Sequence, residues 1–167
     1  MNATPEPRGT VVDAPGGREL QIRRDLTAGI DRVWAALTTS AGLEPWIGRL
    51  EGDPSSGRVT FVMTAEGGDV PPEECVITEC TPPRTFSIDT SVGEDAWHLR
   101  VALSEDGGGT RLLFAQVLGA EPAGSVGPGW EYYLDRLECA LAGEDAAGVD
   151  WDDYYPALKD HYDALAR

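Results

Sequence analysis

The segment from Gly127 to Gly143 constrains the fold more than any other part of the chain. At about 100° per residue, its large apolar side chains lie on one stripe of a helix, with Tyr133 beside them. The stripe consists of Trp130, Leu134, Leu137 and Leu141. Pro128 and its neighbouring glycines precede this pattern and Gly143 follows it, as start and stop signals do. The segment therefore predicts a helix of about 13 residues, long enough to cross a β-sheet.

The chain between Gly57 and Leu118 predicts the sheet that this helix would cross. Apolar and polar residues alternate there with period two, and turns rich in glycine and proline separate the runs. Links of about 4 to 10 residues are too short for the helical crossovers that parallel strands need. We therefore expect an antiparallel sheet wrapped around the long helix, and the space between them is where a function should be sought.

The N-terminal third predicts a hairpin, two short helices and a loop. Residues 11–26 alternate on either side of a glycine-rich turn, as the two strands of a hairpin do. Residues 30–37 have the apolar spacing of a helix, and residues 43–46 indicate a second short helical turn. The glycines and the proline of residues 48–57 then predict a loop that returns the chain to the sheet.

The chain predicts one domain with a short leader and an extension. Residues 1–8 are polar and are expected to be a flexible N-terminus, and residues 9–143 form the domain. Residues 144–167 begin as an acidic linker and continue as a C-terminal helix, with Pro156 in its first turn. We expect this helix to pack against the domain, on the side of the long helix that bears Tyr132.

Charge restricts the class of partner. The chain has 29 acidic and 13 basic residues, a formal charge of −16, which repels phosphate backbones and anionic membrane surfaces. We therefore expect no nucleic acid and no membrane as partner. No run approaches the ~20 apolar residues of a membrane span, which predicts a soluble, cytoplasmic protein. Three cysteines fit a reducing compartment, and two distant histidines make no zinc pattern, so neither a metal nor a cofactor is predicted.

Five pieces of sequence, in matching order, resemble the SRPBCC superfamily and, within it, the bacterial branch of activator-of-heat-shock-ATPase homologue-like proteins. They are Arg24 with Leu26, Val33–Gly48, Pro82–Arg84 before Phe86, Gly109–Leu112, and Gly129–Trp130 with Leu134–Gly143. The resemblance covers residues 9–143 and extends to START lipid-transfer domains and polyketide cyclases. It implies an α+β helix-grip fold, in which a curved antiparallel sheet grips the long C-terminal helix and leaves a cavity for an apolar ligand. Many relatives carry a histidine where this chain has Gln116, so an acid–base role of that histidine is not available here.

The residues themselves predict no catalytic constellation. His98 alternates with Trp97 and Leu99, so we expect it on the solvent side of the sheet, and we expect His161 at the surface. Cys80 is predicted to be buried as a small hydrophobe, with no basic partner that would activate its thiol. No catalytic residue is therefore assigned.

Eight residues are candidates to line a ligand cavity. They are Trp46, Phe61, Met63, Trp97, Phe114, Gln116, Trp130 and Leu134. Apolar walls with a few polar groups are typical of small-molecule sites, but the same aromatic residues could fill a closed core. The Gln116 amide must find hydrogen-bond partners, either on the long helix, in ordered water or on a ligand.

Three functions remain open from the sequence. The first is a small apolar-ligand-binding domain without catalysis, active as a monomer or a homodimer. The second is an enzyme of the polyketide cyclase, aromatase or hydratase kind, and the third is an interaction module that activates a chaperone ATPase. All three rest on the resemblance, the first also on the absence of a catalytic constellation, and a fold alone does not decide among them.

Overall fold

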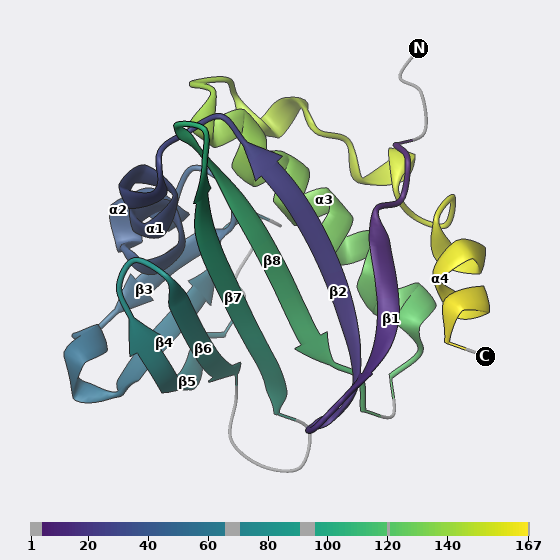
Figure 1. Ribbon diagram of the computed structural model, residues 1–167, viewed down its shortest axis with the longest axis horizontal. Helices are drawn as coiled ribbons and strands as arrows, with labels where there is room; N and C mark the ends of the chain where they lie inside the picture. Colours follow the sequence, from purple (N-terminus) through teal and green to yellow (C-terminus); the bar gives the residue numbers. More distant parts are fainter. Residues whose placement is uncertain (1–4, 66–70, 91–95, 120, 167) are drawn as a thin grey trace.

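The computed structural model describes residues 5–65, 71–90, 96–119 and 121–166, and these form a curved antiparallel sheet around one long helix (Figure 1). The strands are β1 (Gly9–Ala14), β2 (Gly17–Leu26), β3 (Gly48–Glu51), β4 (Arg58–Met63), β5 (Glu73–Thr81), β6 (Thr85–Thr90), β7 (Trp97–Asp106) and β8 (Gly109–Val117). The helices are α1 (Ile30–Thr38), α2 (Ser40–Leu43), α3 (Ala123–Leu141) and α4 (Lys159–Leu165). The α+β helix-grip architecture predicted from the sequence is confirmed.

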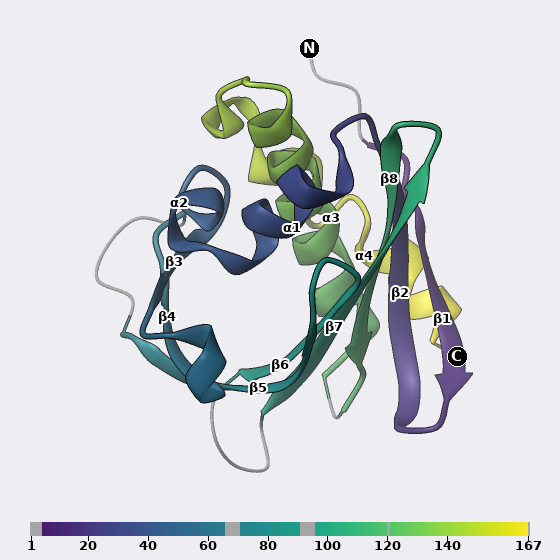
Figure 2. The same cartoon turned by 60° about the vertical axis from the view of Figure 1, so that its left-hand side comes forward.

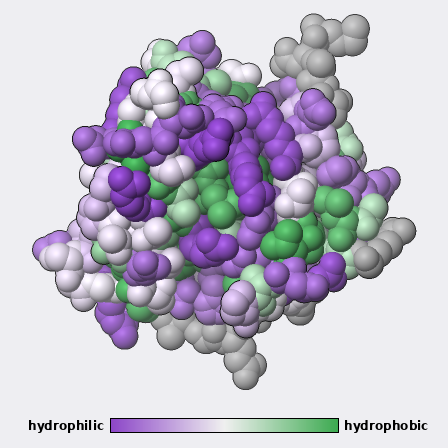
Figure 3. Space-filling view, viewed as in Figure 1, coloured by the Kyte–Doolittle hydropathy of each residue, from purple (hydrophilic) through white to green (hydrophobic). Residues whose placement is uncertain are grey.

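The sheet has the strand order β1-β2-β8-β7-β6-β5-β4-β3, and all neighbours are antiparallel. Strands β3 to β8 form a meander, and the β1–β2 hairpin joins its far edge through β8. Figure 2 shows the sheet bending around α3 and α1, which lie together on its concave side. Hydrophilic side chains cover much of the outer face, with smaller hydrophobic patches between them (Figure 3). The period-two pattern of the strands therefore places apolar side chains on the concave face of the sheet, where the helices pack.

Helix α3 begins earlier than the sequence indicates, because Pro128 and its glycines lie inside it and do not precede it. A Cβ added at Gly127 would lie 2.4 Å from the ring of Tyr162, and one at Gly124 would lie 2.4 Å from a carboxylate oxygen of Asp163. These glycines therefore allow the C-terminal extension to approach the helix backbone closely. Tertiary packing outweighs the low helix propensity of glycine and proline in this first half of the helix.

Two other boundaries differ from the prediction. Strand β3 lies within the predicted loop, where it pairs Gly48 with Met63 and Glu51 with Thr60, and this cross-strand pairing overrides the turn signals of the local sequence. Helix α4 begins at Lys159, so the placement of Pro156 in its first turn is wrong. The preceding residues form short 3-10 turns instead. Asp145 and Asp150 cap these turns by accepting hydrogen bonds from backbone N–H groups two residues later.

A buried ionic network lies on the side of α3 that faces β2. The guanidinium of Arg24, whose side chain is 1% exposed, contacts Glu131 at 2.7 Å and Glu138 at 3.1 Å and also pairs with Asp135. The three carboxylates follow one another along the helix, so they reach the same cation. Although burial opposes the charge, the hydrogen bond and charge of Asp135 and the other carboxylates raise the pKa of Arg24. The Nε of Arg24 is buried without a hydrogen-bond partner among the described residues.

The network also attaches the segment before β1 and the C-terminal extension to α3. One oxygen of Glu131 accepts hydrogen bonds from the backbone N–H groups of Arg8 at 2.7 Å and Gly9 at 3.1 Å, and from the hydroxyl of Tyr162. Tyr162 is fully buried in the same core as Leu20 and Leu137. The predicted docking of the extension on α3 is confirmed, but its helix packs on the first half of α3 and on β1, whereas Tyr132 contacts Trp151 and Tyr154 in the turns before that helix.

Two phenols of the extension are part of this network. Burial and the carboxylate of Glu131 raise the pKa of Tyr162, and burial and the hydrogen bond to Asp135 raise the pKa of Tyr154. The hydroxyl of each phenol donates a hydrogen bond to a carboxylate that also contacts Arg24. The extension is therefore attached by charge-assisted hydrogen bonds as well as by apolar contacts.

Candidate ligand-binding cavity

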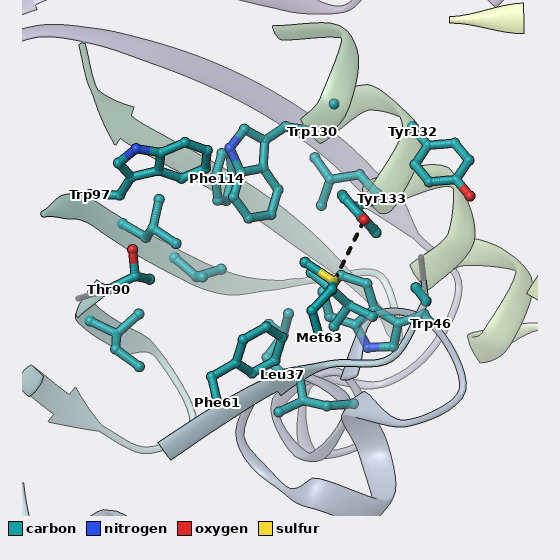
Figure 4. Close-up of a pocket in the computed structure, with 18 of the residues that line it drawn as sticks. Leu37, Trp46, Phe61, Met63, Thr90, Trp97, Phe114, Trp130, Tyr132 and Tyr133 are labelled. Atoms are coloured by element: carbon teal, nitrogen blue, oxygen red, sulfur yellow. Dashed lines mark hydrogen bonds between the residues drawn. The ribbon is translucent and has the colours of Figure 1, made fainter. Parts of the chain in front are cut away.

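A cavity of about 800 Å³ lies between the concave face of the sheet, helix α3 and the turn after α2 (Figure 4). Strands β3 to β8 supply its floor and α3 supplies its roof. Its lining is mainly aliphatic and aromatic. The described residues that line it include Leu37, Ile47, Leu50, Phe86, Ile88, Leu99, Val101, Leu112 and Val126.

The register of the strands explains why these side chains meet. Residues that lie opposite each other in antiparallel strands point to the same face of a sheet. Phe61 lies opposite Glu73, Thr90 lies opposite both Cys75 and Trp97, and all five line the cavity. The alternating pattern on β4 to β7 therefore builds the cavity floor directly.

Aromatic rings form the part of the wall where α3 meets the sheet. The ring centroids of Phe114 and Trp130 are 4.3 Å apart, and those of Trp130 and Tyr133 are 6.1 Å apart. The hydroxyl of Tyr133 on α3 donates a hydrogen bond of 3.6 Å to the sulfur of Met63 on β4 (Figure 4). This wall offers several ring faces to a ligand, with a phenol at one edge.

Gln116 takes a different place from the other predicted residues. It is 2% exposed and does not line the cavity, and its side-chain oxygen accepts a 2.6 Å hydrogen bond from the indole N–H of Trp130. The sequence left open whether the Gln116 amide bonds to the long helix, to water or to a ligand, and the structure shows a partner on the long helix. Gln116 points to the same face of the sheet as the cavity-lining Leu99, and its hydrogen bond fixes the orientation of Trp130.

The other predicted residues lie on the cavity wall, and their part in ligand binding stays a prediction. They are Trp46, Phe61, Met63, Trp97, Phe114, Trp130 and Leu134. Trp46 is 4% exposed and is held by its indole N–H, which donates to the carbonyl of Ala36 at 3.0 Å. Its own carbonyl accepts from Arg136 at 2.8 Å, so the turn after α2 is attached to α3.

Trp151 of the extension is a cavity residue that the sequence prediction missed. It lines the cavity. Its ring meets that of Tyr132 edge to face, with the ring centroids 5.4 Å apart, and stacks on that of Tyr155, with the centroids 5.7 Å apart. Trp151 is 37% exposed, which places it at the rim. Helical spacing identifies neither Trp151 nor Glu73, because one lies in a 3-10 turn and the other begins a strand.

The histidines and Cys80 lie outside the cavity. The predicted exposure of His98 is confirmed, since its side chain is 56% exposed and contacts the Asp89 carboxylate at 2.7 Å, and His161 is exposed as well. The predicted burial of Cys80 is wrong: a bulge between Ile77 and Glu79 interrupts the alternation of β5, and Cys80 is exposed near the end of the strand. The described residues contain no group of three or more His, Cys, Asp or Glu that could hold a metal ion.

A curved sheet that grips a long helix above an apolar cavity defines a helix-grip domain with an internal cavity. The family model for "Activator of Hsp90 ATPase homolog 1-like protein" matches residues 27–142, and the chain belongs to this family. The matched region ends before the extension. None of the described helices is long and apolar enough to span a membrane.

Solved structures share this fold over most of the chain. CalU16 from Micromonospora echinospora is 26% identical with a TM-score of 0.72, over 97% of this chain and 98% of CalU16. A Bordetella parapertussis protein is 26% identical with a TM-score of 0.64, over 93% of each chain. A conserved protein of unknown function from Enterococcus faecalis, 17% identical, has a TM-score of 0.70 over 93% of this chain and 88% of that one. No curated protein matches the chain.

Proposed function

We propose that this protein binds an apolar small molecule in the cavity between the sheet and α3. The observation that carries the proposal is the combination of a volume of about 800 Å³ with a wall that is mainly aliphatic and aromatic. Small-molecule sites are typically about 300–1,000 Å³, with apolar walls and a few polar groups. Transfer of a ligand's apolar surface from water to such a wall is favourable by about 25 cal/mol per Å².

A fluorescence titration tests this proposal. The neutral dye N-phenyl-naphthylamine should bind saturably and become brighter as it leaves water. Thr90→Phe places a ring in the cavity, where Thr90 points from β6, and should weaken dye binding by about tenfold through lost volume (Figure 4). Ser87→Phe is the matched control, because Ser87 lies on the same strand but does not line the cavity.

The outcomes separate a binding space from a packed interior. Equal dye affinity in the wild type and Thr90→Phe would show that the dye binds elsewhere. The absence of saturable binding by the folded wild type would overturn the proposal.

The alternative function is an enzyme of the polyketide cyclase, aromatase or hydratase kind. Tyr133 favours it, since a phenol that lines an apolar cavity can donate a hydrogen bond or a proton to a bound carbonyl. Tyr133→Phe should then abolish turnover of a polyketide-like substrate while dye binding is retained. Unchanged turnover in this variant would remove Tyr133 from the mechanism.

A further inference from the structure

The cavity contains acidic but no basic charge among the described residues that line it. Glu73 is their one ionisable carboxylate, and they include no lysine, arginine or histidine. Among the described lining residues, an anionic ligand buried there would find no cationic partner, and burial of an unpaired charge is costly. The lining therefore disfavours fatty acids and other carboxylates.

The position of Glu73 directs its side chain to the cavity. It is the first residue of β5 and lies opposite Phe61, and Cys75, two residues later on the same face, also lines the cavity. Glu73 is half-buried, and none of the described residues forms a hydrogen bond or an ion pair with its carboxylate. Its neighbour Glu74 is exposed and pairs with Arg58. The carboxylate of Glu73 thus lies at the cavity, whereas that of Glu74 lies at the surface beside Arg58.

The aromatic wall complements a cation. The faces of tryptophan, tyrosine and phenylalanine rings attract ammonium groups, most strongly where water is excluded. Phe61 lies directly across from Glu73 in the sheet, and Trp97, Phe114 and Trp130 extend the aromatic surface along the cavity. The formal charge of −16 adds a field that concentrates cations around the molecule and repels anions.

We propose that the ligand is a lipophilic amine, whose apolar body occupies the cavity and whose ammonium group lies beside the carboxylate of Glu73. This inference rests on the proposed binding function and specifies the ligand's charge. Unlike a neutral molecule of the same shape, the amine gains a charge-assisted hydrogen bond to Glu73 and a cation–π contact with the aromatic wall.

Displacement of the neutral dye by three ligands with the same alkyl chain tests the inference. Decylamine should displace the dye about tenfold more effectively than decanol, and decanoate about tenfold less effectively than decanol. Glu73→Gln should reduce the affinity for decylamine about fivefold and leave that for decanol within about twofold. Glu74→Gln removes the same formal charge one residue away and should leave both affinities within about twofold, because that carboxylate is exposed.

Each result separates the charge preference from binding itself. Equal affinities for decylamine and decanol would overturn the amine assignment while leaving apolar binding intact. An equal loss of decylamine affinity in Glu73→Gln and Glu74→Gln would also overturn it, because a general field would then explain the preference. Tighter binding of decanoate than of decanol would contradict it directly. Failure of the dye and all three ligands to bind would remove the proposed function together with this inference.

Discussion

The two sides of α3 are built from opposite chemistry. On one side Trp130, Tyr133 and Leu134 border a cavity of about 800 Å³. On the other side the carboxylates of Glu131 and Asp135 meet a buried guanidinium and two phenols of the extension. Residues that are adjacent in sequence therefore contribute to different properties. Variants on the extension side should therefore change stability, whereas variants on the cavity side should change binding.

The largest expected effect comes from Arg24→Met on the extension side. The change leaves buried carboxylates without their cation, and breaking a buried ion pair in this way typically costs about 3–5 kcal/mol. Urea unfolding should show a loss of this size in the free energy of unfolding. Dye affinity of the folded fraction should be unchanged.

Arg49→Met is the control for Arg24→Met. Arg49 pairs with Glu51 on the surface, where the two side chains are 43% and 55% exposed, and its loss should cost less than about 1 kcal/mol. Similar unfolding free energies for the two variants would contradict the division between the two sides of α3.

Two glycines of α3 give a sharper comparison, because they are only two residues apart. Gly127→Ala places a methyl group against the ring of Tyr162 and should lower the free energy of unfolding by about 2 kcal/mol. Gly129→Ala meets no atom within 4 Å and lies at the cavity, so it should be neutral or stabilise by up to about 1 kcal/mol. Thermal and urea unfolding of both variants measure the difference. Destabilisation by both to the same extent would show that helix propensity, and not packing of the extension, governs these positions.

The extension side should also respond to alkaline pH. The pKa of Tyr162 and that of Tyr154 are raised on folding, so the folded state retains protons that the unfolded state loses above pH ~10. The contribution of these phenols to stability is complete below that pH. It falls by up to about 1.4 kcal/mol per pH unit for each phenol as the pH rises further. Urea unfolding between pH 9 and about 11 should show this loss.

Tyr162→Phe should reduce the slope of unfolding free energy against alkaline pH. Tyr155→Phe, at an exposed position, should leave the slope as in the wild type. An unchanged slope in Tyr162→Phe would show that the phenol does not titrate with folding.

The smallest effect on stability is expected at Trp151, which belongs to the extension but lines the cavity. Trp151→Ala should lower the free energy of unfolding by less than about 1 kcal/mol, since the side chain is 37% exposed. It should weaken dye binding about fivefold, because part of the cavity wall is lost. Tyr155→Ala is the control, since Tyr155 stacks on Trp151 but does not line the cavity. Equal dye affinities in the wild type and Trp151→Ala would show that the extension contributes nothing to dye binding.

Most of the sheet and the apolar stripe of α3 could be predicted from the sequence, because period-two and helical spacing are local signals. The cavity wall could be predicted largely for the same reason, with Phe61 and Met63 on one face of β4 as the example. The Arg24 network could not, because Arg24 and Glu131 are 107 residues apart and no periodicity relates them. The predicted helix start at Gly127 is wrong, because local sequence does not distinguish a glycine needed for close packing inside a helix from one that flanks a helix.

The hydrogen bonds of Glu131 also bear on the order in which the molecule folds. This carboxylate joins Arg8, 123 positions earlier, to Tyr162, 31 positions later, and so connects nearly the whole length of the chain. Contacts between distant positions require closure of long loops, which carries a large entropic cost until the intervening structure has formed. A chain leaving the ribosome has its sheet residues available well before Tyr162 emerges. We therefore expect the junction at Glu131 to form last and to hold the segment before β1 and the extension against fraying.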